Sequence, residues 1–281
     1  MTLAGGPHGL AATGTVVLAG AGQMGGAMLS AWLDAGMAAR SLEVIEPWPS
    51  EDLLERLGRA GIAINEPSRE DRPADILVLA VKPQGLETAA PELAPFVGPG
   101  TAVVSVVAGK TISDLRRAFP RAGVLVRAMP NTPAAIRQGI TGVAAEPQIT
   151  SAQRAAVQAL LEAVGQVEWL PHEDLIDAVT AVSGSGPAYV FHLTECLAAA
   201  GEAAGLDPLV AMRLARATVQ GAGALMAARP DTPPGVLRRN VTSPGGTTAA
   251  ALEVLAGENG LAPLMAAAIE AARTRAGQLS G

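Results

Sequence analysis

Short runs of apolar residues alternate with amphipathic segments along the first half of the chain. Continuous, β-branched runs are typical of strands that are buried on both faces of a parallel sheet. Strands that alternate with helices predict an α/β fold with a doubly wound sheet of the Rossmann type. The predicted strands are Thr15–Ala19, Leu42–Ile45, Ile76–Val81, Ala102–Val107 and Gly123–Val126, with Thr141–Ala145 as a further candidate. The predicted helices are Gly25–Ala35, Glu51–Gly58 and Ile112–Phe119, and a capping box of Thr150 and Gln153 predicts another that ends near Val164.

The pattern changes after Pro171, where alanine-rich helical segments replace the apolar runs and no further strand is indicated. The sequence therefore predicts a flexible tail over residues 1–13, a dinucleotide-binding domain over 14–170 and an all-α domain over 171–281. Small residues crowd the helices of this second domain, whose apolar faces need cover, so we expect a dimer. The predicted helices are Pro187–Ala204, Pro208–Ala227, Thr248–Ala256 and Leu261–Gln278.

Composition excludes several classes of protein. Apolar residues make up 49% of the 281 residues, and the net charge of −6 offers no basic surface for nucleic acid. We expect neither a membrane span nor a signal peptide. The single cysteine, Cys196, fits a reducing compartment, so we expect a cytoplasmic protein. The three scattered histidines predict no metal site.

A glycine loop follows the first predicted strand and opens the first predicted helix. Its sequence is Gly20-Ala21-Gly22-Gln23-Met24-Gly25. The first glycine permits a tight turn, the second lets a pyrophosphate approach the backbone, and the third lets helix and strand pack closely. Amides at the helix start, with the helix dipole, then hold the phosphates. This loop therefore predicts a bound dinucleotide, with a turn that binds nothing as the alternative.

An acid, Glu46, ends the second predicted strand. A carboxylate at this position usually binds the hydroxyls of the adenosine ribose and repels a 2′-phosphate. No arginine follows directly, because the next residues are Pro47, Trp48 and Pro49. Glu46 therefore favours NADH over NADPH, although a surface acid at a strand end is the alternative.

Two further loops rich in glycine and hydroxyl groups precede helices in the second half. They are Ser183–Ala188 and Asn240–Thr248, and both suit a carboxylate at a helix N-terminus, with two well-capped helices as the alternative. The only lysines are Lys82 and Lys110, and neither of these loops contains histidine. A hydroxyacid dehydrogenase needs a lysine or histidine beside its substrate to take the hydroxyl proton. A cyclic imine reductase needs mainly to hold its substrate against the nicotinamide.

These motifs resemble those of the pyrroline-5-carboxylate reductases over about Val16 to Ala276. The most specific stretches are Ala80–Gln84, Arg127–Thr132, Ser183–Tyr189 and Val241–Leu252. The resemblance implies a Rossmann domain followed by a helical domain that binds substrate and forms a homodimer, which in turn could assemble into a decamer. It also implies reduction of 1-pyrroline-5-carboxylate to L-proline by NADPH or NADH.

The resemblance also implies roles for individual residues. The nicotinamide side of the cofactor would be lined by Val81, Lys82, Pro83 and Ala108, with Asn240 close to the cofactor as well. The substrate carboxylate would be held by Ser243, Gly246 and Thr247, and Thr248 would be the catalytic residue that hydrogen-bonds the ring nitrogen. Many members carry a short polar and a basic residue where Glu46-Pro47-Trp48 stands here, which puts NADPH preference in doubt.

Two other functions stay open at this point. A 3-hydroxyacid dehydrogenase of similar build usually carries a lysine on a helix of its second domain, and this chain has none there. A non-catalytic sensor of NAD(P) would not need Thr248. We interpret Asn131 as a turn residue and His192 as an ordinary helix histidine, and we assign no role to Arg127 or Glu195.

Overall fold

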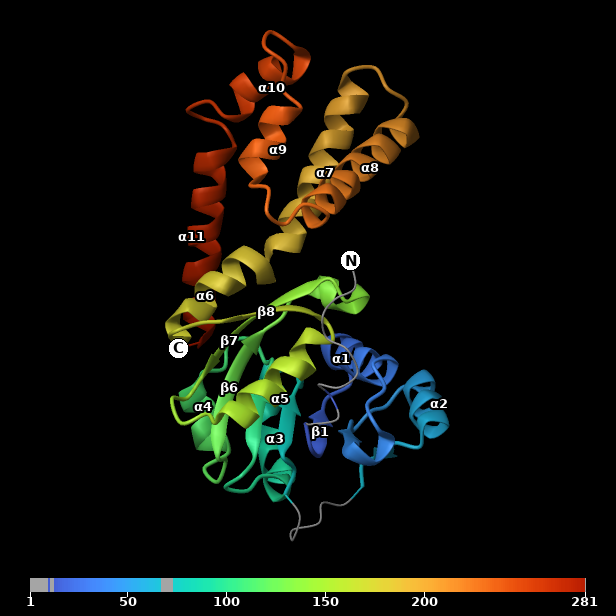
Figure 1. Cartoon of the computed structure of the whole chain (residues 1–281), viewed down its shortest axis with the longest axis vertical. Coiled ribbons are helices and arrows are strands. Elements are labelled where there is room, and N and C mark those ends of the chain that lie inside the picture. Colours follow the sequence, from blue (N-terminus) through green and yellow to red (C-terminus); the bar gives the residue numbers. More distant parts are fainter. Residues whose placement is uncertain (1–9, 11–12, 67–72, 281) are drawn as a thin grey trace. The chain divides into compact units, whose positions relative to one another are not determined.

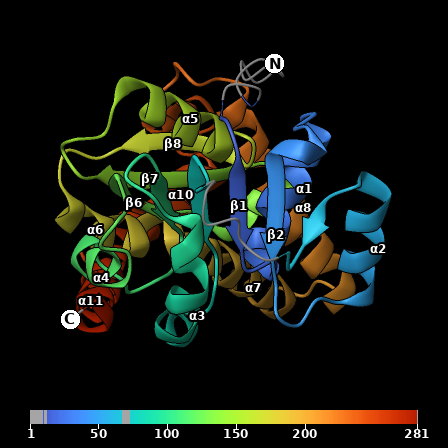
Figure 2. The ribbon, with the colours of Figure 1, turned by 90° about the horizontal axis from the view of Figure 1, so that it is seen from below.

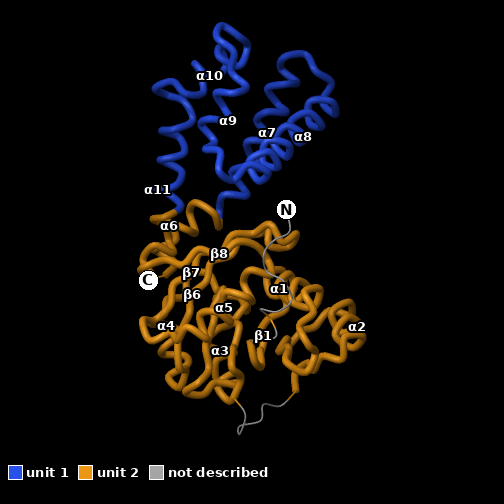
Figure 3. The backbone as a smooth tube through the Cα atoms, in the orientation of Figure 1, with its two compact units in different colours: residues 1, 185–272 blue, residues 2–184, 273–281 orange. Residues whose placement is uncertain are grey.

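The computed structural model describes residue 10, residues 13–66 and residues 73–280, so most of the predicted tail over residues 1–13 lies outside the described residues. Two compact units make up the described chain (Figure 3). We call them the sheet unit, with the described parts of residues 2–184 and 273–280, and the helical unit, residues 185–272. The division at 184/185 differs from the boundary expected after residue 170, because residues 171–184 and the chain's end pack with the sheet.

The described strands of the sheet unit form one sheet in the order β3-β2-β1-β4-β5-β6-β7-β8. Strands β1 to β6 pair in parallel, whereas β7 runs antiparallel to β6 and parallel to β8. Every residue of β1, β4 and β5 is buried, which confirms the expected buried strands. The strands are β1 (Val16–Ala19), β2 (Leu42–Ile45), β3 (Ala63–Ile64), β4 (Ile76–Leu79), β5 (Ala102–Ser105), β6 (Val124–Met129), β7 (Gly139–Ala145) and β8 (Gly165–Trp169).

Helices cover both faces of this sheet (Figure 2). Along β1, Val16 and Leu18 pack with side chains of α1, α2 and α5, while Val17 and Ala19 pack with side chains of α3 and α4. This two-sided burial confirms the doubly wound architecture. The helices are α1 (Gln23–Asp34), α2 (Glu51–Ala60), α3 (Leu86–Leu93), α4 (Ile112–Ala118), α5 (Ser151–Glu162) and α6 (Ile176–Val179), followed by a π-helical turn at Thr180–Gly184.

The helical unit contains helices and no strand in its described residues, as the sequence predicts. Helices α7 and α8 form an antiparallel pair (Figure 1), in which a Cβ at Gly201 would lie 3.3 Å from the Cβ of Ala211. Asp207 caps α8 by accepting from the amide of Leu209 at 3.0 Å. The helices are α7 (Gly186–Ala203), α8 (Pro208–Ala227), α9 (Pro234–Asn240), α10 (Thr247–Leu255) and α11 (Leu261–Ser280), whose last residues belong to the sheet unit.

The sequence pattern does not predict β8, α3 or α9. Strand β8 alternates buried and exposed residues, with Gln166 and Glu168 exposed, so it lacks the continuous apolar run used to find the other strands. Helix α9 has only seven residues and, unlike the equally short α4, no capping box marks its start. Helix α3 carries Pro91 inside it, and proline in a sequence argues against a helix.

Candidate active site

The predicted cofactor-binding residues of the sheet unit follow the carboxyl ends of four neighbouring strands. Ala19 of β1 lies opposite Ile45 of β2 and Leu79 of β4, and Leu79 lies opposite Ser105 of β5. The loops after these strands therefore meet at one sheet edge, where the strand order reverses and open α/β sheets bind ligands. They carry the glycine loop (Gly20–Gly25), Glu46, Val81–Pro83 and Ala108.

The glycine loop has the shape that its three glycines predict. A Cβ at Gly20, whose φ is +92°, would lie 2.7 Å from the Ala80 carbonyl oxygen, and one at Gly25 would lie 2.0 Å from the Gly20 oxygen. Around Gly22 the space is open, because a Cβ there would meet no atom within 4 Å beyond its neighbours along the chain. Helix α1 begins at Gln23 rather than at the expected Gly25, and Gly22 caps it without a side-chain hydrogen bond. The first amides of α1 are thus accessible to a phosphate.

Glu46 reaches the glycine loop, and its binding of the ribose hydroxyls stays a prediction. Its Oε2 accepts from the amide of Ala21 at 2.8 Å, and its Oε1 accepts from the amide of Trp48 at 3.2 Å. Asn65, after β3, holds the backbone of Glu46 on both sides: Oδ1 accepts from the Glu46 amide at 2.8 Å, and Nδ2 donates to the Glu46 carbonyl at 2.9 Å. Sequence reasoning misses Asn65, which has a left-handed φ of +53°, a conformation in which asparagine is enriched.

The loops after β4 and β5 each present an exposed residue. Lys82 is exposed between the half-buried Val81 and Pro83, and Ala108 is exposed directly after the buried Val107. Ala108 lies in a turn with Gly109, whose φ is +71°. Their contacts with the nicotinamide stay predictions, which their place at the sheet edge supports.

Helix α4 begins directly after the second of these loops. Thr111 and Asp114 form a capping box at its start. Burial raises the pKa of Asp114, but hydrogen bonds from the amide and hydroxyl of Thr111 and the charges of Arg117 and Lys110 outweigh it, so the pKa lies below its usual value. The box therefore fixes the position at which this loop enters α4.

The substrate loop expected in the helical unit forms a second open helix start. Helix α10 begins at Thr247, one residue before the expected start, and Gly246 caps it without a side-chain hydrogen bond. The Gly246 amide donates to the Ser243 carbonyl at 3.0 Å, which closes the loop into a tight turn. Ser243 and Thr248 both keep part of their surface accessible to solvent. The four predicted substrate residues thus lie together around the start of α10, Ser243 and Gly246 in the turn before it and Thr247 and Thr248 in its first turn. The predicted approach of Asn240 to the cofactor stays a prediction.

The other hydroxyl-rich segment differs from the expectation of a free loop. Residues 180–184 are π-helical and lead almost directly into α7, with Ser185 at the N-cap position and without a side-chain cap bond. The Ser183 hydroxyl donates to the Val179 carbonyl at 3.1 Å, and the Ser183 carbonyl accepts from Asn131 Nδ2 at 3.1 Å. The Asn131 Oδ1 accepts from the Ile140 amide at 2.9 Å, so Asn131 fixes this turn to β7.

His192 lies on α7 and makes polar contacts with neighbours on its own helix. Its Nδ1 is 3.2 Å from Glu195 Oε2, and its Nε2 is 3.6 Å from Cys196 Sγ. Among residues 10, 13–66 and 73–280, no group of His, Cys, Asp or Glu side chains is arranged to hold a metal ion. No helix in the same residues is both long and apolar enough to span a bilayer.

Comparison with known proteins identifies relatives for both units. A family model described as pyrroline-5-carboxylate reductase dimerisation matches residues 173–279, and one described as NADP oxidoreductase coenzyme F420-dependent matches residues 15–109. A pyrroline-5-carboxylate reductase of Pseudomonas aeruginosa is 39% identical over 269 residues, which cover 95% of this chain and 97% of that protein.

Two solved structures of reductases are similar over nearly the whole chain. The pyrroline-5-carboxylate reductase of Coxiella burnetii has a TM-score of 0.87 and 34% identity, with 96% of this chain and 99% of that one covered. The pyrroline carboxylate reductase of Plasmodium falciparum, solved with NADP bound, has a TM-score of 0.76 and 26% identity, with 95% of this chain and 98% of that one covered.

The Rossmann-type sheet, with its open helix start at the glycine loop, defines a nicotinamide-dependent oxidoreductase with an additional helical unit. Within that class, the chain belongs to the pyrroline-5-carboxylate reductase family. The family resemblance and the fold predicted from the sequence are thereby confirmed. A hydroxyacid dehydrogenase and a non-catalytic sensor are not favoured.

Proposed function

We propose that the chain reduces 1-pyrroline-5-carboxylate to L-proline, the last step of proline biosynthesis, with NADH preferred over NADPH. The observation that carries the reaction is the open, hydroxyl-bearing start of α10 in a member of this family. The glycine loop supplies the matching site for a cofactor, because Gly20 and Gly25 permit its tight, closely packed turn and Gly22 leaves open space before the first amides of α1. The nicotinamide, when bound, supplies the hydride.

The loop before α10 would bind and orient the substrate. The amide of Thr247 and the hydroxyl of Ser243 are proposed to hold the carboxylate, helped by the positive end of the helix dipole. Gly246 is proposed to line the same site, because its own amide closes the turn onto the Ser243 carbonyl. No acidic residue lies in the first turn of α10 to compete with that anion. Thr248 is proposed as the catalytic residue whose hydroxyl hydrogen-bonds the ring nitrogen. The protonated imine already attracts hydride, so binding and orientation are the main tasks of these residues.

The preference for NADH rests on the position of Glu46. Each carboxylate oxygen accepts one backbone amide, from Ala21 and Trp48, which leaves further lone pairs on both oxygens for the two ribose hydroxyls. A 2′-phosphate at the same place would add negative charge beside a carboxylate that the protein already holds in place. The geometry therefore supports a site for an unphosphorylated ribose.

Initial rates with NADH and NADPH, measured with 1-pyrroline-5-carboxylate on the wild type and on Glu46→Ser, test both parts of the proposal. We expect turnover with both proteins, and a rise in the relative use of NADPH in the variant. Oxidation of neither cofactor by the wild type would refute the reaction. An unchanged ratio of the two rates would refute the role of Glu46 while leaving the reaction standing.

We also propose that the helical unit forms a homodimer. Large apolar side chains are exposed along its helices, with 64% exposure of Phe191, 70% of Leu209 and 75% of Val254. A second copy of the chain would cover them, which agrees with the dimerisation model that matches these residues. A monomer in light scattering at micromolar concentration would refute this proposal. A decamer and a cytoplasmic location stay predictions from the sequence.

A further inference from the structure

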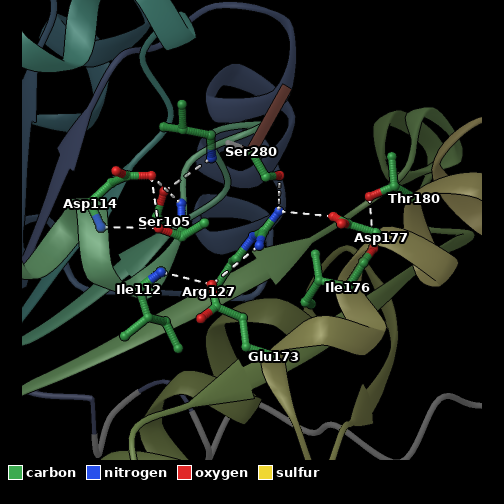
Figure 4. A network of polar contacts seen from close by, with 11 residues as sticks. Ser105, Ile112, Asp114, Arg127, Glu173, Ile176, Asp177, Thr180 and Ser280 are labelled. Atoms are coloured by element: carbon green, nitrogen blue, oxygen red, sulfur yellow. Dashed lines mark hydrogen bonds and ion pairs between the residues drawn. The ribbon is translucent and has the colours of Figure 1, made fainter. Parts of the chain in front are cut away.

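Arg127 on β6 is a buried charge at the carboxyl edge of the sheet. Its side chain is only 7% exposed, and it contacts three residues from distant parts of the chain (Figure 4). Nη1 lies 3.2 Å from Glu173 Oε1, and Nη2 lies 3.5 Å from Asp177 Oδ1 and 3.2 Å from Ser280 Oγ. A buried guanidinium needs such partners, because an unpaired charge in the interior is costly. Arg127 therefore ties the last turn of α11 to the sheet.

The same cluster reaches the loop of residues 106–111, which we call the nicotinamide-side loop because it contains Ala108. Glu173 Oε1, which accepts from Arg127, also accepts from the amide of Ile112 at 2.7 Å, at the first residue of α4 (Figure 4). At the other end of the loop, the hydroxyl of Ser105, which is fully buried, accepts from the Val107 amide at 3.2 Å. Side chains thus hold both ends of the nicotinamide-side loop.

The middle of the nicotinamide-side loop touches the chain's last turn. A Cβ at Gly109 would lie 2.8 Å from the carbonyl oxygen of Leu279 and 3.3 Å from its carbonyl carbon. Gly109 also has a φ of +71°, which favours glycine. The backbone of Leu279 therefore packs directly on the turn that contains Ala108, one residue before Ser280 joins the cluster of Arg127.

We propose that the last turn of α11, through Leu279 and Ser280, is part of the cofactor site, and that Arg127 and Glu173 are the positioning residues that hold it there. The last turn packs against the nicotinamide-side loop at Gly109 and keeps Ala108 in the conformation that binds the nicotinamide. The adenosine end of the cofactor, at Glu46, does not depend on this contact. This inference rests on the proposed use of a nicotinamide cofactor.

A chain that ends at Gln278 tests the inference when its affinities for NADH and for ADP-ribose are measured by calorimetry. ADP-ribose lacks the nicotinamide but keeps the adenosine end and the pyrophosphate. We expect the dissociation constant for NADH to rise about tenfold, equivalent to the loss of one hydrogen bond to a charged group, with that for ADP-ribose unchanged. Equal losses for both ligands, or no loss for NADH, would overturn the inference. Failure of the full chain to bind NADH would refute the proposed function instead.

Point variants in the full chain keep the inference testable if the shortened chain does not fold. Ser280→Ala and Gly109→Ala should each lower the affinity for NADH and leave the affinity for ADP-ribose unchanged. Gln278→Ala, on the exposed side of the same turn, is the matched control and should change neither affinity. Gly109→Ala should also lower the affinity for NADH less in the shortened chain than in the full chain, because the Leu279 oxygen that the new Cβ would strike is gone. Additive effects of Gly109→Ala and the truncation would contradict the proposed contact.

Discussion

Asn65→Ala should release Glu46 from the position that selects the cofactor. In the native chain the Asn65 amide group makes two hydrogen bonds with the backbone of Glu46, at 2.8 and 2.9 Å. The side chain of Glu46 in turn accepts from Ala21 in the glycine loop. Removing the amide therefore loosens the residue that would bind the ribose hydroxyls, without touching the glycine loop itself.

The cost to stability can be divided into two parts. Two solvent-exposed hydrogen bonds contribute together about 1 kcal/mol, at the low end of the usual range. Alanine at a φ of +53° adds about 1 kcal/mol of backbone strain, which glycine would avoid. We therefore expect Asn65→Ala to lower the free energy of unfolding by about 2 kcal/mol, and Asn65→Gly, which loses only the hydrogen bonds, by about 1 kcal/mol.

Urea unfolding at a fixed protein concentration measures these free energies, and initial rates with NADH and NADPH measure the effect on the cofactor. Both variants should weaken the binding of NADH by about fivefold, because about 1 kcal/mol from the positioning of Glu46 is lost. The binding of NADPH should change less. The ratio of the two rates should then be equal in the alanine and glycine variants although their stabilities differ. A wild-type rate ratio in Asn65→Gly would refute the positioning of Glu46 by Asn65.

Three further perturbations test other parts of the site. Gly25→Ala places a Cβ 2.0 Å from the Gly20 oxygen, so NADH affinity should fall at least about a hundredfold; binding within about tenfold of wild type in calorimetry would contradict the close packing. Thr248→Val should lower kcat by about tenfold or more while Thr248→Ser retains most of it, since only serine keeps the hydroxyl; equal rates would remove Thr248 from the reaction. Asp114→Asn should destabilise by about 1 kcal/mol at pH 7. Because folding lowers the pKa of Asp114, the charge of Asp114 contributes its full stability above pH 3.8, the ordinary pKa of this group, and loses it as the pH falls through the folded-state pKa. The difference in unfolding free energy between wild type and Asp114→Asn should therefore shrink at low pH. A difference that stays constant with pH would argue against the capping charge.

Much of the sheet could be predicted because its central strands are buried on both faces. Such strands appear as continuous apolar runs, as in Ile76–Leu79. The edge strand β8 exposes every second residue and escapes that signal. The antiparallel pairing of β7 with β6 also does not follow from the pattern, because burial alone does not specify strand direction.

The candidate site divides in a similar way. The glycine loop and the start of α10 are local motifs, in which neighbouring residues supply the turn and the helix amides, so the sequence predicts them. Asn65 contacts Glu46 across 19 residues, and Ser280 contacts Arg127 across 153. These pairings arise only when the chain folds, and no residue type at either position indicates the partner.

The return of the chain's last residues to the sheet unit has a consequence for synthesis. Domains generally fold in order of synthesis as they leave the ribosome. The sheet unit, however, lacks a hydrogen-bond partner of a buried arginine until Ser280 has been made, long after its last strand is complete. The sheet unit therefore completes its hydrogen bonding only after the whole helical unit has been synthesised, and the two units cannot finish folding strictly one after the other.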